Sequence, residues 1–240
     1  MQSGLEILSW SFWSPETREP AEWRAAHPLA PAQVEATTVP DHAIPALHRR
    51  RMSTLSKMAV QTALEATQSA KPDYLVFCSQ HGELARTREL LAAIVAGGEL
   101  SPTSFSQSVH NASAGLYTII TASQAPATSL AAGAGTFAYG WIEAEAFLAQ
   151  DPGKRVLLVS YDEPLPLEYR PYSAQLQRSH ALALLLGVAP SGGLRLEPSQ
   201  PAAEEPAPLA TLFMAWALTA GSHLSLTAGG QGWTWRRGGA

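Results

Sequence analysis

The chain has 240 residues, of which 46% are hydrophobic and only 15% charged. This length is enough for one sizeable α/β domain, and the low share of charge is compatible with a large buried interface. The net charge of −4 gives no general electrostatic reason to bind nucleic acid or a membrane surface. The single cysteine, Cys78, excludes an internal disulfide framework and, without histidines at ligand spacing, gives no zinc signature.

Segments that direct a chain to or through a membrane are not apparent. The N-terminus lacks the basic start and cleavage site of a secretory signal. The most apolar stretch near the C-terminus, residues 209–220, is shorter than the roughly 20 residues that a membrane helix needs. We therefore expect a protein of the reducing cytoplasm, with no membrane span, no bound metal and no cofactor.

The first half of the chain alternates strand and helix signals. Residues 5–10 read as a short strand, and residues 13–41 have no sustained period and suit a surface excursion. Apolar residues at steps of three and four predict a helix over residues 44–68. The continuous apolar run at residues 73–79 is typical of a strand covered on both faces, and residues 84–95 form the next helix.

The middle of the chain begins with a polar stretch and then returns to helical periodicity. Residues 111–122 predict a helix with small side chains that permit close backbone approach. Residues 126–132 are a short extended segment, and residues 136–150 predict a helix.

Two further buried strands follow at residues 155–161 and 180–188. Residues 190–208 read as a linker, followed by a helix near residues 209–219 and a last strand through Trp233 and Trp235, which share a face. The order of elements predicts an α/β fold, a mixed five-stranded sheet with helices on both faces.

Four segments together resemble the N-terminal half of the β-ketoacyl synthases, and more closely their chain length factors. They are HRRRMSTLSKMA (48–59), SPTSFSQSVHNASAGL (101–116), APATSLAAGAGTFAYGWIEA (125–144) and RVLLVSYDEP (155–164). The resemblance implies a single thiolase-like half over residues 1–240. Its core spans about residues 45–190, and a C-terminal helix and strand extension spans residues 208–237.

The resemblance places the nucleophilic cysteine of active ketosynthases on Ala134, within one residue. Acyl transfer needs a thiolate, hydroxyl or amine there, and neither Ala134 nor its neighbours Gly133 and Gly135 supply one. The second thiolase half, which carries two catalytic histidines in the family, is also absent from this sequence. The resemblance therefore implies a subunit without catalytic residues and without enzymatic activity of its own.

Chain length factors pair with an active ketosynthase, so the resemblance implies a heterodimer of a type II polyketide synthase, such as one that makes an aryl polyene, or of a fatty-acid-like synthase. Arg49, Arg50 and Arg51 are candidates for contact with an acidic acyl carrier protein. The expected strand that pairs with the partner comprises Ala127, Thr128, Ser129, Leu130 and Ala131. The expected acyl-tunnel and interface residues are Thr103, Ser104, Phe105, Ser106, Ser108, Asn111, Ala114 and Gly115.

Two other functions stay open at this point. One is a stand-alone acyl thioesterase or acyltransferase that uses Cys78 with a histidine, although a cysteine in an apolar strand is usually inert. His81 and His110 could form a pair of bases for a hydrolysis, but no nucleophile lies at a defined spacing from them, and such histidines more often order the adjacent loop and turn. The adjacent acids Asp162 and Glu163 could be paired catalytic carboxylates, but such acids at a strand end usually face solvent or cap backbone N–H groups. The other function is a purely structural dimerisation module.

Overall fold

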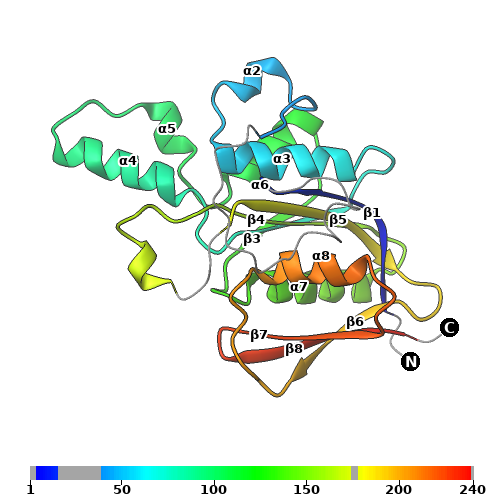
Figure 1. Ribbon diagram of the computed structural model, residues 1–240. Helices are drawn as coiled ribbons and strands as arrows, with labels where there is room; N and C mark the ends of the chain where they lie inside the picture. Colours follow the sequence, from blue (N-terminus) through cyan, green and yellow to red (C-terminus); the bar gives the residue numbers. More distant parts are fainter. Residues whose placement is uncertain (1–3, 16–38, 174–177, 239–240) are drawn as a thin grey trace.

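The computed structural model describes residues 4–15, 39–173 and 178–238, and within these ranges the chain folds around one mixed sheet (Figure 1). The sheet has eight strands in the order β3-β2-β4-β5-β1-β6-β8-β7. Their bounds are β1 Leu5–Trp13, β2 Tyr74–Cys78, β3 Ala127–Leu130, β4 Val156–Asp162, β5 His180–Val188, β6 Leu194–Ser199, β7 His223–Ala228 and β8 Gln231–Arg237.

The α/β class is confirmed, but the prediction of a five-stranded sheet was wrong. The predicted linker at residues 190–208 contains β6, and β7 precedes the predicted last strand to make a hairpin with β8. Most of the predicted surface excursion, residues 16–38, lies outside the described residues. The helices are α2 Ala46–Arg49, α3 Thr54–Ala66, α4 Leu84–Val95, α5 Pro102–Ser106, α6 Ala112–Thr121, α7 Thr136–Gln150 and α8 Leu209–Ala217, with a 3₁₀ turn at Arg170–Tyr172.

Helices cover both faces of the sheet, as the sequence predicts. In β2, Leu75 and Phe77 point into the core beneath α3 and α6, whereas Val76 and Cys78 point into the core beneath α7 and α8. All four side chains are completely buried. Two covered faces explain why β2 is a continuous apolar run rather than an alternating one.

The C-terminal strands β6, β8 and β7 continue the sheet past β1 and turn beneath α7 and α8, which lie between the two parts of the sheet (Figure 1). An aromatic cluster fills this space: the ring of Phe213 lies 5.2 Å from that of Trp141 and 5.5 Å from that of Trp235. Trp233 and Trp235 are both buried on the core side of β8, which confirms the core interpretation of this pair.

In two places the helices of the structure differ from those predicted. The single helix predicted over residues 44–68 is divided into α2 and α3, because the Ser53 hydroxyl accepts a hydrogen bond from the Ser56 N–H at 2.9 Å and starts a new helix. The polar stretch after Ser101 contains the short helix α5, which Ser101 caps and Pro102 begins.

Candidate functional site

The turn between β3 and α7 holds Ala134, the position that the sequence aligns with a ketosynthase nucleophile. Gly133 has a φ of 56°, which a side chain would strain, so the chain can turn sharply here. The Thr136 hydroxyl fixes the turn: it accepts a hydrogen bond from the Ala132 N–H at 2.9 Å and donates to the Gly133 carbonyl at 2.6 Å. The backbone thus forms a sharp strand-to-helix elbow that presents a methyl group.

A cavity of about 20 Å³ lies in front of the elbow, lined by Ala134, Gln80, Ser160, Asp162 and His180 among others. This volume is enough for about one water molecule and far too small for an acyl chain. His180 was not singled out from the sequence. The signal in the sequence was its place at the start of the apolar run 180–188. The antiparallel register of β4 and β5 then pairs His180 with Asp162 at the end of β4.

The C-terminal hairpin approaches the same elbow. A Cβ atom at Gly229, in the turn between β7 and β8, would lie 4.0 Å from the Cβ of Ala134. Glu204 holds this turn by accepting hydrogen bonds from the N–H groups of Gly229 at 3.1 Å and Gly230 at 2.6 Å. The space in front of the elbow is therefore bounded by residues from the end of the chain.

Polar side chains near the elbow organise loops. The Asp162 carboxylate accepts hydrogen bonds from the Ser79 hydroxyl at 2.8 Å and from the backbone N–H groups of Gln80 at 3.0 Å and His81 at 3.3 Å. The capping interpretation of Asp162 is therefore confirmed. His110 Nε2 lies 2.8 Å from the Ser79 carbonyl oxygen, so this histidine also orders the loop after β2.

Glu163 differs from its neighbour Asp162 in its electrostatics. Burial, followed by repulsion from Glu83, Asp162 and Glu89, raises the pKa of Glu163 to about 7, while Arg86 opposes the shift. Glu163 is therefore close enough to three other acids to be repelled by them, and Arg86 in the first turn of α4 is the cation that opposes this repulsion.

Cys78 has none of the properties of a nucleophile. Its side chain is completely buried, and burial raises the pKa of the thiol, with the charges of Asp162 and Glu143 adding to the shift. A Cβ atom built on Gly140 of α7 would lie 2.3 Å from Cys78 Sγ, so the helix packs directly on the sulfur. This burial argues against acyl transfer through Cys78.

The predicted pairing strand lies at one edge of the sheet, where β3 pairs only with β2 among the described strands. The Pro126 and Leu130 carbonyls accept hydrogen bonds from the Leu75 and Ser79 N–H groups. Backbone groups alternate in direction along a strand, so the even-numbered residues bond to β2. The N–H and C=O groups of Ser129 consequently face the open edge.

Helices α4 and α5, residues 84–106 with their connection, project away from the body as an arm (Figure 1). None of the residues in α4 or in α5 is buried. Large apolar side chains of the arm and the residues just after it are nevertheless exposed: Leu91 (52%), Ile94 (55%), Val95 (89%), Leu100 (40%), Phe105 (65%) and Val109 (49%). An apolar surface without a core of its own is typical of a segment that packs on another molecule.

The predicted tunnel and interface residues fall on the arm and on α6. Thr103, Ser104, Phe105 and Ser106 belong to α5, which replaces the expected loop, and Ser108 follows it. Asn111 and Gly115 are exposed at the start of α6, and a Cβ atom at Gly115 would meet no atom within 4 Å. Ala114 is the exception: it is 3% exposed and packs in the core beneath α3, so it does not belong to the exposed set.

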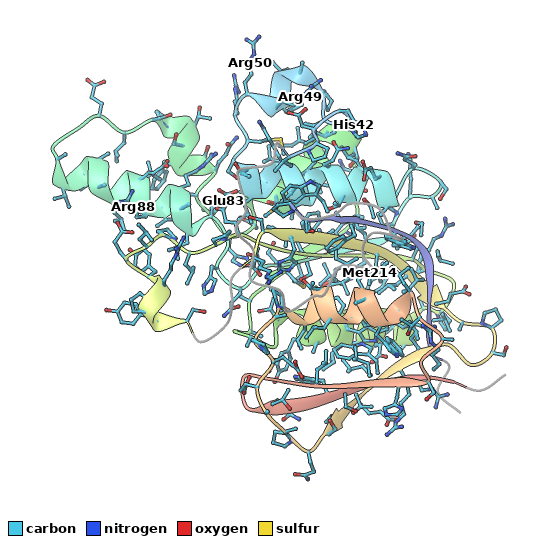
Figure 2. All side chains as sticks on the ribbon, viewed as in Figure 1. His42, Arg49, Arg50, Glu83, Arg88 and Met214 are labelled. Atoms are coloured by element: carbon cyan, nitrogen blue, oxygen red, sulfur yellow. The ribbon has the colours of Figure 1, made fainter. Side chains whose placement is uncertain are left out.

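The three arginines have different surroundings. Arg49 Nη1 lies 3.3 Å from the Asp41 carboxylate, and the Arg51 carbonyl accepts a hydrogen bond from Arg86. Arg50 is exposed and points outward from the end of α2 (Figure 2). Among the described residues no group of His, Cys, Asp or Glu side chains could hold a metal ion, and no helix is long and apolar enough to cross a membrane.

The sheet, its two helical layers and the strand-to-helix elbow define a thiolase-like half. Residues 21–236 match the family model described as "β-ketoacyl synthase, N-terminal domain". The chain therefore belongs to the β-ketoacyl synthase family. No curated protein matches its sequence.

Solved structures are also similar to this chain. A chain in the complex of the ketosynthase ApeO with its chain length factor ApeC from Xenorhabdus doucetiae is 27% identical, with a TM-score of 0.87 over 98% of this chain and 99% of that one. The ishigamide ketosynthase/chain length factor matches at 12% identity and a TM-score of 0.71, over 98% and 100%. A β-ketoacyl synthase from Burkholderia phymatum STM815 matches at 12% and 0.59, over 90% of this chain and 69% of that one.

Proposed function

We propose that this chain is a non-catalytic chain length factor that pairs with an active ketosynthase and shapes its acyl tunnel. The observation that carries the proposal is the elbow, which has the sharp turn of a nucleophile site but presents the methyl group of Ala134 to a cavity of about 20 Å³. Without a nucleophile, no acyl-enzyme can form at this position. The ketosynthase/chain length factor complexes among the similar structures support the same role.

The surface around β3 fits a partner subunit. Along its outer edge β3 pairs with no other described strand, so this edge offers backbone groups to a partner, and on the neighbouring helix α6 the side chain of Ile119 is 66% exposed. The apolar arm, which precedes α6 in the chain, projects away from the body (Figure 1). We infer that β3 pairs with the ketosynthase and that the arm reaches over it, which brings Phe105 to the partner's acyl tunnel.

The proposed complex belongs to a type II polyketide synthase, of the aryl-polyene or another polyene-forming kind, or to a fatty-acid-like synthase. Its carrier protein is expected to approach Arg50 and Arg51, which are exposed, because acyl carrier proteins are acidic. Arg49 is already paired with Asp41 and contributes less to such a contact. A purely structural module would share the dimer surface but would leave product length unaffected.

The isolated chain is expected to take up no acyl group from a loaded carrier protein. Ala134 has no nucleophilic atom, and the Cys78 thiol is buried and has a raised pKa. Intact-mass measurement after incubation with acyl carrier protein checks this, with the partner ketosynthase as the positive control. A stable acyl adduct on this chain would contradict the non-catalytic assignment.

Phe105→Ala is expected to lengthen the products of the reconstituted synthase, and Ser106→Trp or Ser108→Trp to shorten them. Forcing extra methylenes against a packed wall costs about 1–3 kcal/mol, enough to slow elongation roughly ten-fold. Mass spectrometry of the products measures the distribution. The Phe105 side chain is 65% exposed in this chain, so the alanine variant should keep its melting temperature.

This experiment also tests the proposal as a whole. Unchanged product lengths in all three variants, with the complex still assembled on size-exclusion chromatography, would remove the chain-length role from this segment. A general loss of products together with a lower melting temperature would instead show that Phe105 serves the stability of its own subunit.

A further inference from the structure

A buried carboxylate lies at the root of the arm. Glu83, labelled in Figure 2, directly precedes α4, and its side chain is 3% exposed. Glu83 Oε1 accepts hydrogen bonds from the Ser53 hydroxyl at 2.7 Å and the Ser56 hydroxyl at 2.6 Å, both in the first turn region of α3. Since α3 packs on the sheet, these bonds fix the start of the arm to the body of the protein.

Arg86 connects this anchor to the segment in which the arm returns to the body after α5. Its Nε lies 3.7 Å from Glu83 Oε2, and its Nη1 donates a hydrogen bond to Gln107 Oε1 at 2.6 Å. Its Nη2 also donates to the Arg51 carbonyl at 3.3 Å. The Arg86 side chain is only 15% exposed, so solvent weakens these interactions less than those of a surface arginine.

Gln107 is well placed to transmit this restraint to Phe105. It is the C-cap of α5, and its backbone N–H bonds to the carbonyls of Phe105 and Thr103. No residue in α4 or α5 is fully buried, and in α4 the half-buried residues lie mainly in its first turn, residues 84–87, so packing on the body is largely confined to the root of the arm. Directed polar contacts at this root are therefore well placed to set the orientation of the arm.

We propose that Arg86 is a positioning residue which, anchored on Glu83 and bonded to Gln107, fixes α5 and thereby the place of Phe105 relative to the partner subunit. The effect on product length rests on the proposed function; the restraint on α5 in the isolated chain does not. The sharpness of the product-length distribution then depends on the Arg86–Gln107 bond.

Gln107→Ala removes the bond while leaving the Arg86–Glu83 pair intact. In the isolated full chain we expect amide hydrogen exchange across residues 103–108 to become about ten-fold faster, as the loss of a hydrogen bond to a charged group implies. In the complex with the ketosynthase, the product distribution should broaden toward longer chains. Gln107→Glu keeps an acceptor for the guanidinium and should preserve both properties.

Arg88→Ala is the matched control on the same helix. Arg88 Nη2 bonds to Glu168 at 2.6 Å, but the two side chains are 47% and 52% exposed, so this pair should contribute little. The labelled Arg88 in Figure 2 lies on the arm beyond its root. Arg86→Ala is a less clean variant, because it leaves the buried Glu83 carboxylate without its cation.

The outcomes separate the two levels of the proposal. Unchanged exchange in Gln107→Ala overturns the restraint itself. Faster exchange with unchanged product lengths, while Phe105→Ala still alters them, overturns the positioning role and leaves the proposed function intact. If neither Gln107→Ala nor Phe105→Ala alters product length, the chain-length role of this segment fails and the positioning role fails with it.

Discussion

Ser129→Pro is expected to abolish association with the ketosynthase while the isolated chain still folds. The N–H of Ser129 faces the open edge of β3, because the neighbouring even-numbered residues make the bonds to β2. Proline removes this outward donor and places its ring where an incoming strand would lie, so the dissociation constant should rise at least about 100-fold. Size-exclusion chromatography and a binding titration with the ketosynthase measure the loss.

Thr128→Pro is the matched control, since the adjacent N–H points toward β2. That change should lower the melting temperature of the isolated chain, whereas Ser129→Pro should alter it little. Ser129→Ala keeps the backbone donor and should bind as the unmodified chain does. An intact complex with Ser129→Pro would show that another surface, rather than β3, pairs the two subunits.

Sequence periodicity predicted the elements that are strongly periodic or buried on both faces. The predicted bounds of α4, α7 and β5 agree with the structure. Their signals are strong for physical reasons: all but the last residue of β5 are buried, and α7 presents Phe137, Trp141, Ala144 and Leu148 to the core at helical spacing.

Strands β6 and β7 escaped prediction, whereas the last strand, β8, was predicted through Trp233 and Trp235. In β6 the local sequence contradicts the usual strand signals. Pro198 lies within β6, where proline argues against a central strand. The structure tolerates it because β1 pairs with β6 only at Leu5 and Leu194, so most of that edge of β6 needs no ladder donor. This arrangement depends on the long-range curvature of the sheet, which no local pattern encodes.

The candidate site was predictable where it depends on alignment and not where it depends on packing. The strand-to-helix segment placed Ala134 at the elbow from the sequence alone. The run of small residues in α6, in contrast, could not show that Ala114 faces the core while Gly115 faces open space. Similarly, the polar stretch around Phe105 gave no indication that it forms a helix on a projecting arm.

Glycines in two helices differ in what surrounds them: Gly140 of α7 packs against the core of this chain, and Gly115 of α6 faces open space. Gly140→Ala is expected to destabilise the protein by about 1–3 kcal/mol, although alanine is the better helix former by about 1 kcal/mol. The new Cβ would lie 2.3 Å from Cys78 Sγ and 2.9 Å from Leu158 Cδ1, and both side chains are completely buried. Chemical denaturation of the isolated chain measures the change, and Cys78→Ala in the same chain should restore part of it.

Gly115→Ala is the matched control and should have the opposite sign. A Cβ at this position of α6 meets no atom within 4 Å, so the isolated chain should gain up to about 1 kcal/mol from helix propensity. Because the fold itself does not need a glycine at position 115, weaker binding of the ketosynthase by this more stable variant would place the backbone of α6 in close contact with the partner. Stabilisation by Gly140→Ala would contradict the close packing of α7 on the sheet, and with it the geometry assigned to the elbow at the start of the same helix.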